Sequence, residues 1–334
     1  MTIKIGINGF GRIGRAVFRA ITTNQAYENI EVVAINDLTP CTTLAHLLKY
    51  DSVMGGWQKK VEATQNGLLI DGKEVVVSHE SDPGQIPWKK FGASYVVEST
   101  GRFAAADKAA AHMKGGAERV IITAPAKGEV RTIVMGVNED SYDPNVDKIV
   151  SNASCTTNCL APVAQVIMER FGIVSGMMTT VHSYTGDQRL TDQPHKDLRR
   201  ARAAALSMIP THTGAATAIG LVIPELQGRF SGLSVRVPTP NVSLVDAVMV
   251  VETPCTVAEV NSALKESSNQ YLDYSDEPLV SIDYLGNPYS SIVDSISTLV
   301  VGNQIKVLSW YDNEWGYANR VLDLINHMQS QETL

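Results

Sequence analysis

The residues best suited to chemistry lie in the segment 151–159, which reads Ser-Asn-Ala-Ser-Cys-Thr-Thr-Asn-Cys. Residues 148–151 have the pattern of a strand end, and residues 160–170 carry the apolar spacing of a helix. Ser154 is therefore the expected N-cap, and Cys155 falls in the first turn. Unpaired N–H groups and the helix dipole favour negative charge there, so we expect the Cys155 thiol to ionise easily.

Two other interpretations of this segment stay open. Most free cysteines are small buried apolar residues, and Cys155 could be one of them. Cys159 lies one helical turn further on, so the two thiols could form a redox or metal pair. Two ligands are too few to close a zinc site, so we predict no metal and interpret Cys159 as a packing residue.

A reactive thiol needs a group that accepts its proton, and seven histidines are available. His182 follows an expected strand at 177–181 and precedes a polar run. His212 lies in another polar turn, Pro-Thr-His-Thr-Gly. Spacing favours His182 as the partner of Cys155, although a structural role for either histidine remains open.

The basic run at 195–202 has two ordinary explanations, a solvated helix face and a subunit contact. It is short and has no interleaved aromatics, which argues against nucleic-acid binding. Guanidinium groups, hydroxyls and free backbone N–H groups together are what a phosphate site requires. We expect such a site to be formed by Arg200, Arg236, the hydroxyls of Ser154, Thr156, Thr185 and Thr213, and the N–H of Gly214.

A strand, a Gly-x-Gly-x-x-Gly turn and a helix follow one another over residues 3–21. Gly9 permits the tight turn, Gly11 lets backbone approach a pyrophosphate, and Gly14 allows close helix packing. The next strand ends at Asp37, where a carboxylate would bind a ribose hydroxyl and repel a 2′-phosphate. The pattern predicts a dinucleotide-binding domain that prefers NAD to NADP.

The order of the remaining elements predicts an α/β fold with two domains. Further βα units follow the first, with strands at 73–78, 94–97, 120–123 and 148–151. Longer alternating strands follow residue 176, which indicates an α+β layer with a mostly antiparallel sheet. We therefore expect a Rossmann domain at 1–151, completed by a C-terminal helix at 315–334, and a catalytic domain at 152–314.

Composition narrows the class of protein. The chain has 334 residues, 44% of them hydrophobic, and a net charge of -7, which argues against a general nucleic-acid or anionic-membrane surface. We find no apolar run long enough for a membrane span and no signal-peptide profile. Four cysteines in so long a chain make no disulfide framework, so we expect a cytoplasmic protein.

These motifs together resemble those of the glyceraldehyde-3-phosphate dehydrogenase family, in its phosphorylating NAD-dependent bacterial form. The resemblance covers essentially the whole chain. It rests on the glycine turn at 7–14, the cysteine segment at 151–159, Thr-Thr-Val-His at 179–182, Arg-Val-Pro-Thr-Pro-Asn-Val at 236–242 and Tyr-Asp-Asn-Glu-Trp-Gly at 311–316.

The resemblance implies a reaction and a set of roles. Cys155 attacks the aldehyde of D-glyceraldehyde 3-phosphate, His182 accepts the hydroxyl proton during hydride transfer, and inorganic phosphate converts the thioester to 1,3-bisphosphoglycerate. Two anion subsites follow from the family pattern. The substrate phosphate is held by Thr185 and Arg236, the attacking phosphate by Ser154, Thr156, Thr213 and Gly214, and Arg200 lies between them.

The same resemblance implies cofactor contacts. Arg12, Ile13, Asp37 and Thr123 match residues that contact NAD, and Asn313 matches the one that fixes the nicotinamide carboxamide. Two positions depart from the commonest pattern: Ser81 stands where a basic residue is frequent, and Gln193 where NAD-specific relatives usually have leucine. Gln193 leaves room for a polar 2′-substituent, so NAD is expected as the primary cofactor without strict exclusion of NADP.

Two rival functions remain. An erythrose-4-phosphate dehydrogenase shares the cysteine, histidine and glycine motifs but deviates around the attacking-phosphate site, which is intact here at 213–216. A binding protein that keeps the fold without turnover should have lost Cys155 or His182, and both are present. The resemblance also implies a homotetramer, with the loop at 186–203 near a subunit boundary.

Overall fold

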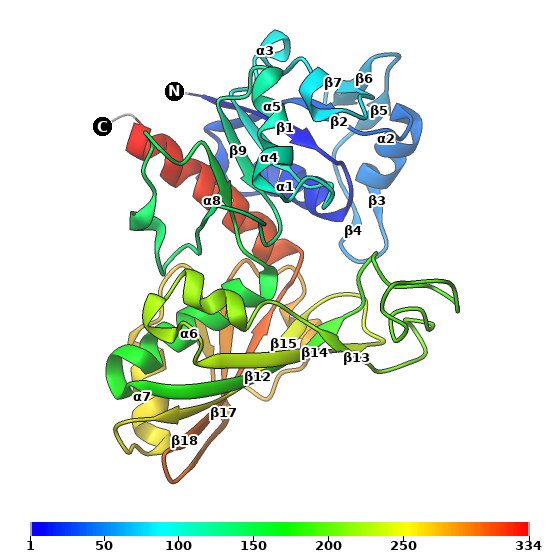
Figure 1. Cartoon of the computed structure of the whole chain (residues 1–334). Coiled ribbons are helices and arrows are strands. Elements are labelled where there is room, and N and C mark those ends of the chain that lie inside the picture. Colours follow the sequence, from blue (N-terminus) through cyan, green and yellow to red (C-terminus); the bar gives the residue numbers. More distant parts are fainter. Residues whose placement is uncertain (1, 333–334) are drawn as a thin grey trace. The chain divides into compact units, whose positions relative to one another are not determined.

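The computed structural model describes residues 2–332 and divides into two compact units (Figure 1). The first contains the described parts of 1–133, 139–153 and 318–334, and the second contains 134–138 and 154–317. Residues 1, 333 and 334, which fall within the predicted Rossmann domain and its C-terminal helix, lie outside the described part of the chain.

A nine-stranded sheet forms the centre of the first unit, in the order β10-β11-β9-β8-β1-β2-β7-β6-β5. The pairings from β10 to β7 are parallel, and β6 and β5 continue the sheet as antiparallel strands. The strands are β1 (Ile3–Asn8), β2 (Ile30–Asn36), β5 (Val61–Ala63), β6 (Gly67–Ile70), β7 (Lys73–Ser78), β8 (Tyr95–Glu98), β9 (Arg119–Ile122), β10 (Arg131–Thr132) and β11 (Ile149–Ser151). A separate two-stranded ribbon pairs β3 (Tyr50–Asp51) with β4 (Gly55–Gly56).

The second unit contains a seven-stranded sheet in the order β13-β14-β12-β15-β18-β17-β16. Four of its six pairings are antiparallel; β12–β14 and β16–β17 are parallel. The strands are β12 (Ile173–Ser183), β13 (Ile209–His212), β14 (Phe230–Val237), β15 (Ser243–Val251), β16 (Leu272–Ser275), β17 (Ser291–Val301) and β18 (Gln304–Tyr311).

Helices connect and cover these sheets. The α-helices are α1 (Arg12–Thr23), α2 (Cys41–Lys49), α3 (Trp88–Phe91), α4 (Ala106–Ala109), α5 (Ala111–Lys114), α6 (Cys155–Phe171), α7 (Val257–Glu266) and α8 (Trp315–Glu332). In the second unit, α6 and α7 pack against the sheet, where α6 contacts β15, β17 and β18 (Figure 1). A capping box formed by Thr256 and Glu259 opens α7.

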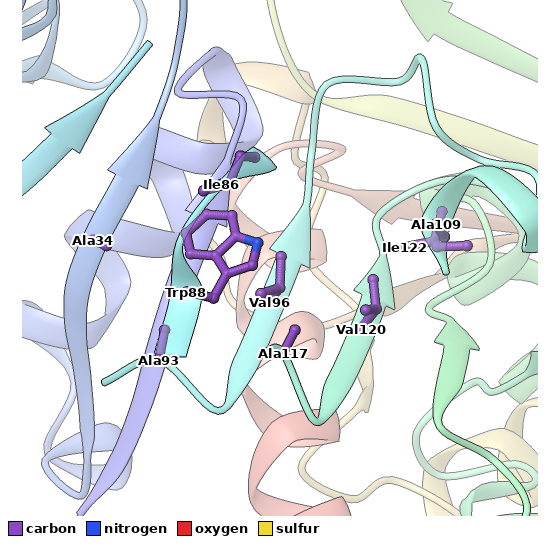
Figure 2. Packing of buried hydrophobic residues seen from close by; sticks show 9 residues of the cluster. All are labelled: Ala34, Ile86, Trp88, Ala93, Val96, Ala109, Ala117, Val120 and Ile122. Carbon is purple, nitrogen blue, oxygen red and sulfur yellow. The ribbon is translucent and has the colours of Figure 1, made fainter. Parts of the chain in front are cut away.

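Apolar packing on one face of the first sheet is dense (Figure 2). The indole of Trp88 lies so close to β1 that a Cβ at Gly6 would sit 2.4 Å from one of its ring carbons. Glycine is therefore required there by close approach. The cluster consists of Ala34, Ile86, Trp88, Ala93, Val96, Ala109, Ala117, Val120 and Ile122, all buried.

The part of α8 within the first unit is fixed by polar contacts as well as by its apolar stripe. The Tyr27 hydroxyl donates to Asp323 Oδ1 at 3.0 Å. Glu332, near the end of the helix, accepts from the Tyr95 hydroxyl at 2.8 Å and is also paired with Arg119. This segment therefore belongs to the first unit although it follows the second in the chain.

The predicted fold class is confirmed: the first unit has a mostly parallel sheet joined by helices, and the second is an α+β unit with a mostly antiparallel sheet. The structure adds elements that the sequence analysis did not anticipate, notably the helix α2 and the strand β17.

Candidate active site and cofactor loop

The cysteine predicted to react lies at the start of a long, largely buried helix. Cys155 is the first residue of α6, and Ser154 is its N-cap, as the sequence predicted. The Ser154 hydroxyl accepts from the Thr157 N–H at 3.0 Å. This cap fixes the first turn and therefore the position of the Cys155 sulfur.

His182 is the histidine that meets this sulfur. It lies at the end of β12, is 4% exposed, and places Nε2 3.6 Å from Cys155 Sγ. Its Nδ1 is 2.7 Å from the Ser183 carbonyl oxygen, which can only accept. In the tautomer that satisfies this carbonyl, with the proton on Nδ1, the Nε2 lone pair faces the thiol. His212, the other candidate, is exposed at the end of β13 and has no contact with Cys155 among the described residues.

The expectation that Cys155 ionises easily is wrong for this structure. Cys155 is half-buried, and desolvation by the surrounding protein raises the pKa of its thiol. The Arg236 charge and hydrogen bonds in the first turn oppose that effect without overcoming it. Burial, with help from Arg236, lowers the pKa of His182 to about 3. The resting pair is a neutral thiol beside a neutral imidazole that can accept its proton.

Positive charge lies directly beside this pair. Arg236 Nη1 is 3.0 Å from His182 Nδ1, and its hydrogens are accepted by the Ser183 carbonyl and the Thr185 hydroxyl, each at 3.1 Å. Among residues 2–332, Arg236 Nε is one of the buried donors without a hydrogen-bond partner. A donor set of this kind suits an anion.

Arg200 lies in the same neighbourhood but is already bonded to protein groups. Its Nε donates to Thr211 Oγ1 at 2.9 Å, and its Nη2 donates to the His212 carbonyl at 3.2 Å. Nη1 forms an ion pair with Asp187, which also accepts from the Thr185 hydroxyl. Asp187 therefore bridges Thr185 and Arg200, and the Thr185 hydroxyl in turn contacts Arg236.

The residues expected to hold the attacking phosphate differ in their surroundings. Gly214 is exposed, and a Cβ there would meet nothing within 4 Å. Thr213 Oγ1 accepts from the Ala215 N–H at 3.2 Å. Thr156, by contrast, is buried and its hydroxyl bonds to the Tyr311 hydroxyl at 2.9 Å. Thr213 and Gly214 thus lie in an open loop, whereas the Thr156 side chain is part of the interior.

The amide of Asn313 is held from one side. Its Oδ1 accepts from the hydroxyls of Ser183, at 2.9 Å, and Ser243, at 2.8 Å. Two donors on one atom orient the amide, so the Nδ2 group is the end left to donate elsewhere.

Cys159, the second cysteine of α6, is fully buried, with Sγ 3.6 Å from Ser291 Oγ and the Ser309 carbonyl. Its contacts are those of a packing residue.

The glycine turn of the first unit has the geometry that close backbone approach requires. Gly9 adopts a φ of +90°, a conformation that favours glycine. A Cβ at Gly14 would lie 2.3 Å from the Gly9 carbonyl oxygen. A Cβ at Gly11 would meet no atom within 4 Å. The turn is therefore tight at Gly9 and Gly14 and open at Gly11.

The expected cofactor residues lie around this turn. Asp37 follows β2, and its carboxylate accepts from the N–H groups of Phe10, at 2.7 Å, and Thr39, at 2.9 Å. Arg12 and Ile13 begin α1 and are half-buried, with Arg12 paired to Asp51 at 2.9 Å. Thr123, after β9, donates from its hydroxyl to the Glu98 carbonyl at 3.1 Å, and Ser81 is exposed after β7.

A network of hydrogen bonds between buried polar side chains lies at the carboxyl ends of the strands beside the glycine turn. Trp88 Nε1 donates to His112 Nδ1 at 3.1 Å, so His112 Nε2 carries the proton that it gives to Glu98 at 2.9 Å. Asn8 Nδ2 donates to the same carboxylate at 2.6 Å and its Oδ1 accepts from Asn36 at 2.8 Å. These bonds tie the ends of β8, β1 and β2 together.

Sequence reasoning missed two residues of the second unit. Asp187 and Tyr311 contact predicted site residues. Asp187 had a usable signal, since it lies two residues from the predicted phosphate ligand Thr185. The role of Tyr311 depends on a contact far apart in the sequence.

A Rossmann unit with a glycine turn, together with a second unit that holds a contacting cysteine–histidine pair, is the architecture of an NAD-dependent oxidoreductase. Residues 3–106 match the family model described as the glyceraldehyde 3-phosphate dehydrogenase NAD binding domain, and residues 154–313 match its C-terminal domain. The chain belongs to the glyceraldehyde-3-phosphate dehydrogenase family, and the predictions of family and cofactor are confirmed.

Similar proteins match over nearly their whole length. The chain is 58% identical to the glyceraldehyde-3-phosphate dehydrogenase of Geobacillus stearothermophilus, covering 99% of both chains. It is 58% identical to glyceraldehyde-3-phosphate dehydrogenase 1 of Bacillus cereus, over 98% of this chain and 99% of the relative. For glyceraldehyde-3-phosphate dehydrogenase 2 of Bacillus subtilis the identity is 54%, over 99% and 98%.

Proposed function

We propose that the chain oxidises D-glyceraldehyde 3-phosphate to 1,3-bisphosphoglycerate with NAD and inorganic phosphate, as an enzyme of glycolysis and gluconeogenesis. The observation that carries the proposal is the contact between His182 Nε2 and Cys155 Sγ beside the Arg236 guanidinium. A thiol with an adjacent proton acceptor and a neighbouring anion site is suited to acyl transfer on a phosphorylated aldehyde.

The first chemical step uses the neutral pair directly. His182 Nε2 accepts the thiol proton as Cys155 Sγ attacks the aldehyde carbon, and it returns that proton to the new oxyanion to give a hemithioacetal. His182 then accepts the hydroxyl proton while the C–H hydride leaves, which produces a thioester. Bound NAD supplies the hydride acceptor. Phosphate attacks the thioester carbonyl, and the Cys155 thiolate leaves.

Two anion subsites bind the phosphate groups that take part in these reaction steps. Thr185 and Arg236 bind the phosphate of the substrate, and Arg200, which lies between the two subsites, contributes to its binding. Ser154, Thr213 and the open backbone of Gly214 bind the attacking phosphate. Because the Thr156 hydroxyl is bonded to Tyr311, we assign to Thr156 a contribution through its backbone at the start of α6. Water-exposed loops beside the buried sulfur let phosphate reach the thioester.

The first unit fits NAD. Open space at Gly11, the positive φ of Gly9 and a carboxylate at Asp37 match a pyrophosphate and a ribose diol. Arg12, Ile13, Thr123 and Ser81 complete the cofactor contacts, and the Nδ2 group of Asn313 donates to the nicotinamide carboxamide.

Asp37→Ala should lower the preference for NAD over NADP about tenfold, measured as the ratio of their dissociation constants. Unchanged selectivity would assign the preference to other residues, Gln193 among them.

We also propose a cytoplasmic homotetramer. Large apolar side chains are exposed in the loop expected at a subunit boundary, including Leu190 at 81% and Leu198 at 80%. Exposed apolar surface of this extent is typical of protein contacts. Across residues 2–332, no helix combines the length and apolarity needed to cross a membrane. Sedimentation velocity tests the assembly, and a monomer at micromolar concentration would contradict it.

The decisive test of the reaction is its dependence on phosphate. Steady-state oxidation of D-glyceraldehyde 3-phosphate is followed as NADH formation with and without inorganic phosphate, and with arsenate as a substitute. We expect turnover to require one of the two anions. Turnover that is independent of both, or faster turnover with erythrose 4-phosphate, would favour the erythrose-4-phosphate dehydrogenase alternative.

A further inference from the structure

The carboxylate of Asp187 occupies donors that the substrate phosphate needs. Its Oδ1 accepts from the Thr185 hydroxyl, and its Oδ2 is paired with Arg200 Nη1. Both partners belong to the subsite proposed for the substrate phosphate. An acidic side chain bonded to two members of an anion site needs an explanation, because a carboxylate and a phosphate compete for the same hydrogens.

The Thr185 hydroxyl makes the competition strict. A hydroxyl has one hydrogen to donate, and Thr185 gives it to Asp187. The oxygen of the same hydroxyl accepts from Arg236 Nη1 at 3.1 Å. Phosphate oxygens at neutral pH mainly accept hydrogen bonds, so a phosphate can gain the Thr185 hydrogen only when Asp187 releases it.

Asp187 is charged under these conditions. Burial opposes its ionisation, but the Thr185 hydrogen bond and the charges of Arg236 and Arg200 hold the pKa of Asp187 below its ordinary value. The side chain is 41% exposed, so it can rotate toward solvent without disrupting a core. It therefore both repels an incoming phosphate and can move aside for it.

The remaining donors do not depend on Asp187 for their position. Arg236 is also held by the Ser183 carbonyl at 3.1 Å. Arg200 is held by Thr211 at 2.9 Å and by the His212 carbonyl at 3.2 Å. Removal of the Asp187 charge should leave both guanidinium groups in place and weaken the hold on the Thr185 hydrogen, and removal of the whole side chain should free it.

We propose that Asp187 is an internal anion that competes with the substrate's phosphate for Thr185 and Arg200 and thereby limits the affinity for phosphorylated aldehydes. The inference rests on the proposed function, because it takes Thr185, Arg200 and Arg236 as the substrate-phosphate subsite. It assigns to Asp187 a role in specificity and release rather than in the chemical step.

The proposal is tested by the ratio of kcat/KM for the phosphorylated aldehyde to kcat/KM for the unphosphorylated one. The kcat/KM values for D-glyceraldehyde 3-phosphate and for D-glyceraldehyde are measured with the full-length protein, its Asp187→Asn variant and its Asp187→Ala variant. We expect both substitutions to raise the ratio of phosphorylated to unphosphorylated substrate about three- to tenfold at low salt, mainly through KM. The gain should shrink in roughly 1 M potassium chloride, which screens the repulsion.

A matched control removes a carboxylate from the same loop. Asp192 is 62% exposed and pairs with Arg202 at 3.0 Å, outside the proposed subsite. Asp192→Asn should leave the ratio as it is in the parent protein. An equal rise in Asp192→Asn would show that net charge, not competition for Thr185, explains the effect.

Thr185→Val separates this inference from the function on which it rests. Loss of specificity for the phosphorylated substrate in Thr185→Val, with no rise in Asp187→Asn or Asp187→Ala, overturns only the role of Asp187. An unchanged ratio in Thr185→Val would instead overturn the proposed phosphate subsite. A lower ratio in the Asp187 variants would show that the carboxylate orders the site rather than competes with its ligand.

Discussion

The two units prepare for their ligands in different ways. In the first, the edge at Gly9 and Asp37 is shaped by backbone, and the polar side chains beneath it, from Asn36 to Glu98, are bonded to one another. In the second, Arg236 Nε is buried without a partner, and His182 Nε2 faces a thiol. The backbone geometry of the first unit is suited to binding a cofactor. The second unit instead offers side-chain groups that can bind an anion or accept a proton.

This contrast predicts that substitutions of Cys155 and His182 in the second unit reduce turnover, whereas substitutions in the glycine turn of the first unit reduce stability or cofactor affinity. The largest effect belongs to Cys155→Ser. A hydroxyl at this position is a far weaker nucleophile than a thiol, so turnover should fall by more than about a thousandfold. NADH formation measures the loss, and calorimetric titration with NAD should show an unaltered dissociation constant. Substantial residual activity would remove Cys155 from its role.

His182→Gln tests the proton acceptor. Gln keeps a polar side chain but cannot accept and return a proton, so kcat should fall by about a hundred- to ten-thousandfold. The rate of Cys155 alkylation by iodoacetamide, measured across pH, provides an independent readout. A kcat within threefold of the parent would show that another group moves the proton.

A pair of alanine substitutions tests the role of shape in the first unit. Gly14→Ala places a Cβ 2.3 Å from the Gly9 carbonyl oxygen and should lower the free energy of unfolding by about 1–3 kcal/mol. Gly11→Ala meets nothing within 4 Å and should leave stability within about 0.5 kcal/mol while weakening NAD binding. Urea unfolding and NAD titration separate the two effects. Equal losses of stability would contradict the distinction.

The buried histidine also predicts a pH dependence of stability. Burial and Arg236 lower the pKa of His182 to about 3, whereas an unfolded histidine titrates near 6.5. Between these values the unfolded chain binds more protons, so stability falls as the pH falls, by about 1.4 kcal/mol per pH unit for this group. Above pH 6.5 the contribution is complete. Urea unfolding of the parent and of His182→Gln from pH 4 to 7 should show a steeper slope in the parent, and parallel slopes would contradict the assignment.

The sequence predicted what local patterns determine. The strand, glycine turn and helix at residues 3–21 and the N-cap at Ser154 depend on near neighbours in the chain, and all appear in the structure. The mostly antiparallel sheet followed from the alternation of its strands. Periodicity and capping act over a few residues, which explains this success.

What the sequence could not provide depends on distant contacts. The helix start at Cys155 suggested an ionised thiol, but burial by tertiary packing raises its pKa. Tyr311 reaches Thr156 from 155 residues away, and Asp187 meets Arg200 across a loop. Such contacts have no spacing rule, so neither the enclosure of the thiol nor the competition of Asp187 for Thr185 could be derived from the motif.

The central claim is that the second unit carries the substrate as a thioester on Cys155. Mixing the protein with NAD and D-glyceraldehyde 3-phosphate in phosphate-free buffer, followed by rapid acid quench and intact-protein mass spectrometry, tests this directly. We predict a mass increase of one 3-phosphoglyceroyl group per chain, located on Cys155 by peptide mapping and removed when phosphate is added before the quench. NADH formation without an adduct, or an adduct of the same size on Cys155→Ser, would contradict the account.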